Sequence, residues 1–209
     1  INLSINDIST YQTDKYWIAE GSKGLRSIQR KGSNSFEALN EPIILDGPYS
    51  NSAFDIVCKN DKVYMIIGGK DLLNGKRFDK GGYILTYDYD KWSFIDPKEA
   101  QKKLNLPRNP RDYTSIAVTT DDSNDEIVYA SSMGDGVIQY KNGTPVQSYN
   151  EKNAFKETAG GYGSGYCYID GLAFDKNGNL WMTSSEVNHA VLVLDKAGAW
   201  HRLDIEQLR

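Results

Sequence analysis

The chain has 209 residues, with 24 basic and 28 acidic side chains and a formal net charge of −4. This balance argues against nucleic acid or an anionic membrane surface as the main partner, because both require a clustered basic surface. No stretch approaches 18 consecutive apolar residues, so the sequence offers no candidate membrane-spanning helix. The chain is rich in Tyr, with 14 residues, and its apolar runs alternate with Gly, Asn and Asp turns, which predicts an all-β protein.

The chain begins with Ile1 rather than Met, and no charged segment followed by an apolar one stands at its start. We therefore expect a processed product from which any targeting segment has been removed. The two cysteines, Cys58 and Cys167, are too few for a disulfide scaffold and lack the spacing of a metal knuckle. Cys58 lies in an apolar run, where a small buried core residue is expected.

A unit of four short strands repeats four times along the chain. In the last repeat, two β-rich runs at 169–174 and 180–184 flank an Asn/Gly turn, and further runs follow at 190–194 and 200–203. Runs of this kind separated by tight turns predict antiparallel hairpins. In the three earlier repeats the first strands are expected at 5–10, 54–58 and 114–119, and the second strands at 16–19, 63–67 and 127–131. The third strands are expected to begin at 24, 82 and 136, and the fourth strands to lie at 36–39, 92–95 and 146–149.

The spacing of the repeats is that of β-propeller blades. Four-stranded sheets recurring every 40–50 residues or so are typical of propellers. We predict four four-stranded antiparallel blades in a single partial propeller over 1–209. The blades are expected at about 1–40, 53–96, 113–150 and 168–209.

A propeller blade buries both faces against its neighbours, so the blades must close into a ring. Four blades fit a part of a larger ring better than a complete one. An open arc would expose two apolar faces, and we expect self-association through them.

The linker after the second blade predicts a short helix near 97–106. Asp96 is a suitable N-cap, Pro97 suits the first helical position and Glu99 suits the third. Pro107 is a stop signal. A purely structural role for this helix would be to fill the junction between two blades.

The segment 169–184, with Asp175, Gly178, Asn179, Leu180 and Trp181, resembles the two-component regulator propeller repeat. The first and third repeats match it more loosely, because both lack the Asn-Gly hairpin. This resemblance implies a β-propeller and, in one branch of the family, a periplasmic glycan-sensing domain of a hybrid two-component system.

The second repeat is similar to the amino-terminal propeller of PorZ-like proteins, which are accessory components of type IX secretion in Bacteroidetes. The similarity lies in 47–54, Val63-Tyr64, Gly68-Gly69 and Gly82-Tyr83, followed by Trp92-Ser93. It implies a seven-bladed ring, of which this chain would be about half, and an exported protein in the periplasm or on the cell surface. It transfers no ligand residues to this sequence.

The lengths of the loops point to one face of the propeller as a binding surface. Strand direction alternates, so links between blades and loops between second and third strands share one face. All the long segments belong to that face, and long loops on a rigid scaffold commonly carry binding residues. These segments are 40–53, 70–81, 96–112 and 150–168.

Aromatic and charged side chains in these loops are the candidate residues for binding a ligand or a partner. The run 159–168 alternates Gly with Tyr, which gives flat contact surfaces that suit sugar rings or a protein. The loop 70–81 mixes charged residues with one aromatic residue. The alternatives to a binding role are a solvated hairpin extension for 70–81 and a flexible spacer for 159–168. The candidates are Tyr49, Arg77, Phe78, Tyr162 and Tyr166.

Catalysis finds little support in the sequence. The histidines His189 and His201 are expected on a loop and an outer strand at the surface, and no metal-binding spacing includes them. The turn 175–179 is expected to be a hairpin rather than a calcium loop, and the acidic turn 121–126 to be solvated rather than a weak calcium site. We therefore expect neither an enzyme nor a cofactor.

Two functions remain open. The first is a non-catalytic propeller module that contacts envelope or secretion-system proteins, and the second is a propeller that senses oligosaccharide for a two-component system. A hydrolase or lyase propeller would require carboxylates or histidines converging on the central channel, which the sequence does not reveal.

Overall fold

The computed structural model describes residues 7–20, 24–44, 46–50, 52–155, 165–185, 187 and 190–203. The chain divides into two compact units, Ile1–Gly47 and Pro48–Arg209. Regular structure in the described residues is antiparallel β-sheet apart from one helix, which confirms the predicted all-β class with propeller-type blades. None of the helical structure in these ranges is long and apolar enough to cross a membrane.

The first unit contains one four-stranded antiparallel sheet in which consecutive strands pair. Its strands are β1 (Asp7–Gln12), β2 (Lys15–Ala19), β3 (Leu25–Gly32) and β4 (Ser35–Ala38). After β4 the chain turns back to the sheet, where Ile43 pairs with Leu25 at the start of β3. The unit therefore corresponds to one predicted blade, and the segment that follows β4 pairs with the start of β3.

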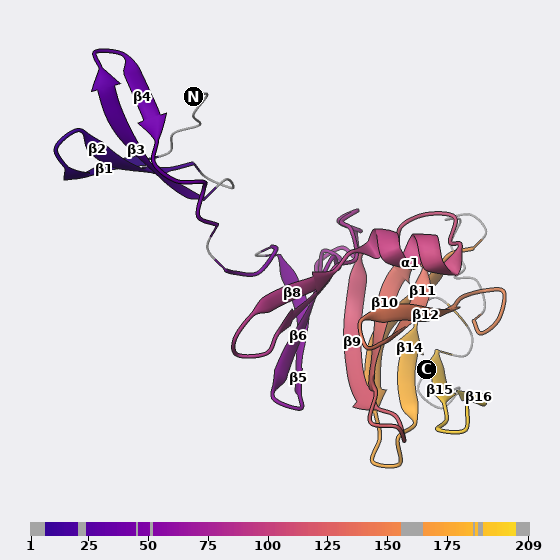
Figure 1. Ribbon diagram of the computed structural model, residues 1–209. Helices are drawn as coiled ribbons and strands as arrows, with labels where there is room; N and C mark the ends of the chain where they lie inside the picture. The colour runs from indigo at the N-terminus through magenta and orange to yellow at the C-terminus, as the bar shows by residue number, and fades with distance from the viewer. Residues whose placement is uncertain are drawn as a thin grey trace. The chain divides into compact units, whose positions relative to one another are not determined.

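The second unit contains three further four-stranded sheets, and the last two of them are hydrogen-bonded to each other as one eight-stranded sheet (Figure 1). The first is β5 (Ala53–Lys59), β6 (Lys62–Ile67), β7 (Ile84–Tyr87) and β8 (Trp92–Ile95). The second is β9 (Tyr113–Thr120), β10 (Glu126–Gly134), β11 (Gly136–Lys141) and β12 (Thr144–Tyr149). The third is β13 (Cys167–Phe174), β14 (Leu180–Ser184), β15 (Val191–Leu194) and β16 (Trp200–Leu203).

Hydrogen bonds link the second and third of these sheets through β10 and β13. The register of β10 with β9 shifts between Ser131 and Ser132, and the end of β10 then runs toward the next sheet. There Met133 pairs with Tyr168 and Gly134 pairs with Cys167. Adjacent blades are thus joined by backbone pairing as well as by side-chain packing.

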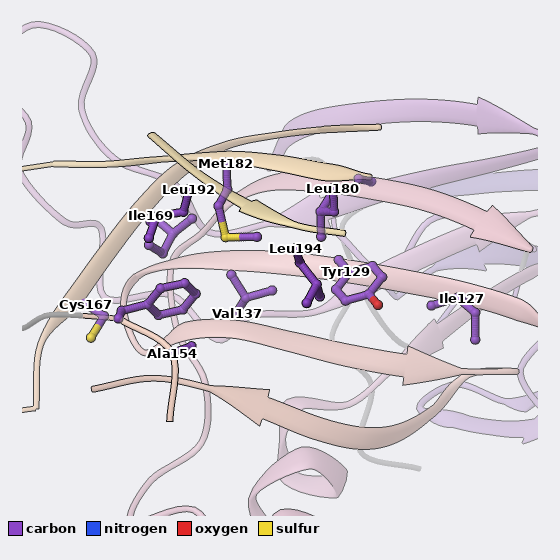
Figure 2. Packing of buried hydrophobic residues seen from close by; sticks show 12 residues of the cluster. Ile127, Tyr129, Val137, Ala154, Cys167, Ile169, Leu180, Met182, Leu192 and Leu194 are labelled. Atoms are coloured by element: carbon purple, nitrogen blue, oxygen red, sulfur yellow. The ribbon is translucent and has the colours of Figure 1, made fainter. Parts of the chain in front are cut away.

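The middle sheet packs against another sheet on each of its two faces. Successive side chains of a strand point to opposite faces, and β10 uses both. Val128 and Ala130 pack toward the β5–β8 sheet, in a cluster with Tyr64 and Ile66. Tyr129 and its neighbours pack toward the β13–β16 sheet. Figure 2 shows this second cluster, which includes Ile127, Val137, Ile169, Leu180, Met182 and Leu194.

The turn between β13 and β14 shows why the repeat motif has its spacing. The Asp175 carboxylate accepts hydrogen bonds from the backbone N–H groups of Asn177 and Asn179 and, at 3.0 Å, from the indole N–H of Trp181. The bond from Trp181 is the largest cause that lowers the pKa of Asp175 from 3.8 to about 2. The motif residues therefore form one hydrogen-bonded hairpin, as expected.

Glycine opens the third strand of two blades for a common steric reason. A Cβ atom on Gly136, whose φ is +76°, would lie 2.1 Å from the backbone oxygen of Tyr149. In the first unit, a Cβ atom on Gly24 would lie 2.3 Å from the backbone oxygen of Ile43. In both blades backbone at the end of the fourth strand or just after it passes directly over this position, so a side chain there is excluded.

The helix α1 (Pro97–Leu104) follows β8 and packs against β12 (Figure 1). Asp96 caps its start by accepting a hydrogen bond from the Lys98 N–H at 2.9 Å. Asn105 adopts the left-handed conformation with φ 52° and ends the helix two residues before the predicted limit of 106. Ala100 is fully buried in the cluster between β5–β8 and β9–β12, which agrees with a plug at a blade junction.

The expectation for Cys58 was wrong, because its side chain is exposed whereas Cys167 is buried. Cys58 and Ile56 share one face of β5, and Ile56 is also exposed, so the apolar run does not mark a buried face in this unit. The grouping of all four sheets in one partial ring over 1–209 stays a prediction.

Candidate binding site

Three of the long segments meet on one face of the second unit, as the alternation of strand direction predicts. Arg77, in the β6–β7 loop, reaches Asp112 at the start of β9. Lys70 of the same loop forms an ion pair with Asp170 of β13 at 2.6 Å. Tyr166, just before β13, lies against Arg77 and Arg108. We call the surface formed by Lys70, Arg77, Arg108, Asp135 and Tyr166 the loop face.

Asp112 anchors this surface from inside the protein. Its side chain is fully buried, with no exposed area, and its carboxylate accepts three hydrogen bonds. The donors are Nε of Arg77 at 3.1 Å and the backbone N–H groups of Asp79 and Lys80 at 3.2 and 2.9 Å. A buried carboxylate needs such donors because burial removes its water. Asp112 therefore fixes both the path of the β6–β7 loop and the direction of the Arg77 side chain.

Tyr166 is the aromatic centre of the loop face. The guanidinium carbons of Arg77 and Arg108 lie 5.7 and 4.9 Å from its ring centroid, within the range of cation–π attraction. Arg108 also donates a hydrogen bond to the Tyr166 hydroxyl at 3.2 Å. This bond, followed by the positive charge of Arg108, lowers the pKa of the Tyr166 hydroxyl.

Arg108 is held in turn by Asp135, which connects β10 to β11. Nε of Arg108 donates to Oδ1 of Asp135 at 2.7 Å, and the backbone N–H of Arg111 donates to Oδ2 at 3.1 Å. The Arg108 side chain is about one-third exposed, so it is oriented by the protein and still accessible. An oriented, accessible guanidinium is well suited to bind a carboxylate or a carbonyl of a partner.

A cleft of about 390 Å³ opens beside Tyr166 and Arg108. Its walls combine the segment after α1 with the segments that precede β13, so both apolar and charged groups face the opening. Pockets of this size that mix apolar walls with a few polar groups commonly bind a ligand or a side chain of a partner. The other lining residues include Pro107, Pro110, Asp135, Glu151 and Lys152.

Tyr49 belongs to a separate aromatic cluster. Its ring centroid lies 4.6 Å from that of Tyr83 and 4.7 Å from that of Phe94. Tyr49 and Phe94 expose half or more of their surface. The cluster presents flat apolar rings with hydroxyl groups at their edges, a combination that suits stacking on a sugar ring.

The structure thus brings together two of the predicted residues, Arg77 and Tyr166. Phe78 is exposed and lies near Nζ of Lys80, which is 5.4 Å from its ring centroid. Tyr162 lies outside the described residues, as does His189. His201 is exposed on β16, where Nε2 lies 2.7 Å from the Asp195 carboxylate.

Sequence reasoning missed Arg108, Asp112 and Asp135 at the loop face. Arg108 lies in a Pro-Arg-Asn-Pro segment after the predicted helix. A charged residue between two prolines is the feature of the sequence that could have identified it as a site residue. Asp112 and Asp135 are single acidic residues beside strand ends. Their part in the loop face depends on ion pairs with Arg77 and Arg108, which are distant in the sequence. Tyr83 and Phe94 were assigned to strands, which obscured their contact with Tyr49.

The acidic turn before β10 contacts lysine. Lys141 lies 2.8 Å from both Asp121 and Asp125, and its hydrogen bonds lower the pKa of each carboxylate. Among the residues that the structure describes, no group of three or more metal-binding side chains converges on one point.

Comparison of the sequence with protein-family models finds no match, and comparison with curated proteins finds none either. Comparison with solved structures finds PorZ of Porphyromonas gingivalis, an essential bacterial surface component of the type IX secretion system. It is similar with a TM-score of 0.62 and 23% identity over 96% of this chain. The chain spans 26% of the length of that protein.

Extracellular domains of two regulatory proteins of B. thetaiotaomicron also match. BT4673, described as a one component system, matches with a TM-score of 0.47 and 13% identity over 99% of this chain and 26% of its own length. BT3049, described as a hybrid two component system, matches with a TM-score of 0.43 and 13% identity over 96% of this chain and 23% of its own length. PorZ, whose relatives the second repeat resembles in sequence, is therefore among the similar structures. The likeness to PorZ shows that this chain has the propeller-type fold of that protein.

Proposed function

We propose that this chain is a non-catalytic β-propeller interaction module of an exported, PorZ-like protein that acts in type IX secretion. Its loop face binds a protein of the envelope or the secretion system, in the periplasm or at the cell surface. The observation that carries the proposal is the oriented, accessible guanidinium of Arg108 beside the Tyr166 ring and a cleft of about 390 Å³. Tyr and Arg are the residue types that most often dominate protein interfaces.

The similarity in fold to a secretion-system surface component supports the direction of this proposal. The arrangement of the loop face supports binding rather than bond-making. Its charged groups are engaged in ion pairs, Lys70 with Asp170, Arg77 with Asp112 and Arg108 with Asp135. The Ser185 hydroxyl donates to Asp170 at 2.6 Å, and that carboxylate is also neutralised by Lys70. We also keep self-association through the open faces of the terminal blades as part of this proposal.

A capture experiment tests the proposal. The 209-residue chain is immobilised and exposed to a detergent extract of envelopes from the bacterium that produces it. We expect mass spectrometry to identify an envelope or secretion-system component. Replacing Arg108 by Ala removes the guanidinium and should reduce recovery by roughly tenfold, the typical loss at an interface hot spot.

Arg30→Ala is the matched control, because Arg30 is an exposed arginine of β3 whose guanidinium donates to backbone oxygens of Gly32 and Ser33 in its own hairpin. This variant should recover as much partner as the parent chain. Recovery of no envelope component, or equal recovery with Arg108→Ala, would contradict the proposal.

The alternative is a periplasmic propeller that senses glycans for a hybrid two-component system. The exposed cluster of Tyr49, Tyr83 and Phe94 favours it, because stacked aromatic rings with hydroxyl edges suit sugars. A complete gene that continues into a membrane-spanning helix and a kinase domain would favour this alternative over the secretion module.

A further inference from the structure

A second cleft, of about 660 Å³, opens between the β9–β12 and β13–β16 sheets at the strand ends opposite the loop face. Residues of the β9–β10, β13–β14 and β15–β16 turns line its rim. We call it the short-turn cleft and define it by six of its lining residues: Tyr129, Gln139, Lys141, Tyr149, Phe174 and Lys176.

The rings of Tyr129, Tyr149 and Phe174 line one wall of the short-turn cleft, which we call the aromatic wall. The ring centroids of Tyr129 and Tyr149 lie 6.4 Å apart with nearly parallel planes, and that of Phe174 lies 5.9 Å from Tyr129 at a steep angle. All three belong to the ordered packing between the two sheets, so their positions are fixed before any ligand arrives. A fixed aromatic surface binds flat apolar groups with little loss of side-chain entropy.

Polar groups stand beside this aromatic wall. The Tyr149 hydroxyl donates to the side-chain oxygen of Gln139 at 2.9 Å, which orients the amide. Within the described part of the chain, no protein group accepts a hydrogen bond from the amide nitrogen of Gln139. Gln139 lines the cleft together with Asn177 and Lys176, so its two N–H donors are available to a bound ligand.

The charges around the cleft cancel. Three lysines and three aspartates line it, and most of them form pairs across the opening or along its rim. Lys141 pairs with Asp121 at 2.8 Å, and Lys196 pairs with Asp122 at 2.8 Å. A phosphate, a nucleotide or a metal ion would need an excess of one sign, so the balance favours a neutral ligand.

We propose that the short-turn cleft binds a neutral saccharide of one or two sugar rings. The apolar face of a ring packs on the aromatic wall, and its hydroxyl groups accept from the Gln139 amide and Lys176. The volume lies within the usual range of pockets for small ligands, about 300–1,000 Å³. This site is separate from the loop face and does not depend on the function proposed for that surface.

Saturation-transfer NMR on the 209-residue chain tests this inference. The probes are maltose, cellobiose and N,N′-diacetylchitobiose, each a neutral disaccharide. At least one should receive saturation from the protein. The Gln139→Ala variant should weaken its binding by roughly tenfold, as expected from the loss of one or two hydrogen bonds to a buried ligand.

Gln101→Ala is the matched control, because Gln101 lies on α1 and lines neither the short-turn cleft nor the cleft at the loop face. It should bind as the parent chain does. Lys176→Ala, on an exposed turn, serves as the second cleft variant should Gln139→Ala lower the melting temperature. Failure of all three disaccharides to bind, or binding unchanged by both cleft variants, would overturn the inference.

Discussion

Replacing Gly136 by Ala is expected to destabilise the second unit by about 3 kcal/mol. A non-glycine residue at a positive φ costs about 1–2 kcal/mol, and the new Cβ would also lie 2.1 Å from the backbone oxygen of Tyr149. Backbone must move to relieve that contact, which disturbs the pairing of β11 with β12. Urea unfolding followed by tryptophan fluorescence measures the change in the free energy of unfolding.

The matched control separates the two causes. Gly143 in the β11–β12 turn has a similar φ of +73°, but a Cβ atom there would meet nothing closer than Ile95 at 4.0 Å. Gly143→Ala should therefore cost only about 1 kcal/mol, the conformational part alone. Equal losses for the two variants would show that the backbone at the end of β12 does not pass over the start of β11.

Replacing Asp112 by Ala is expected to cost about 3 kcal/mol, as is usual when one partner of a buried, hydrogen-bonded ion pair is removed. Three donors would lose their acceptor at once, among them the guanidinium of Arg77. Because the same carboxylate directs Arg77 toward Tyr166, the variant should also reduce capture of a partner by the loop face. Urea unfolding and the capture experiment measure the two effects.

Asp79→Ala provides the comparison within the same cluster. Asp79 is about two-thirds exposed, and its carboxylate lies 3.7 and 3.8 Å from the nearest nitrogens of Arg77 and Arg111. Exposed ion pairs of this kind contribute about 0–1 kcal/mol. A loss for Asp112→Ala no greater than that for Asp79→Ala would contradict the anchoring role of Asp112.

Local sequence signals were sufficient to place most strands. The strands 92–95 and 200–203 have the bounds expected from their aromatic and β-branched residues between turns. The hairpin at Asp175 was recognisable because all of its hydrogen bonds lie within seven residues. The helix ended early at Asn105, because an Asn in the left-handed conformation stopped it before the proline did.

Contacts between distant segments could not be read in the same way. The pairing of β10 with β13 depends on a register shift at Ser131, which leaves no mark in a single sequence. Cys58 was misplaced because an apolar run does not say which of its alternating side chains are covered. The loop face could be located from loop lengths, but Asp112 could not be singled out among 28 acidic residues.

The glycine at the start of the third strand could be predicted only in part. Its recurrence at Gly24 and Gly136 was visible in the sequence, whereas its cause became visible only with the backbone that passes over it at the end of the fourth strand or just after. The third strand of the β5–β8 blade departs from this pattern, since a Cβ atom on Gly82 would meet the ring of Tyr113 rather than backbone.

Zero-length carbodiimide cross-linking of the full chain tests most directly the claim that radial blades gather the long loops on one face. The reagent joins only amines and carboxylates in contact. We predict a link between Lys70 and Asp170, which lie 2.6 Å apart in different blades, and a second between Lys196 and Asp122 at the opposite strand ends. A monomer in which Lys70 is joined to Asp121 or Asp122 instead would contradict the account.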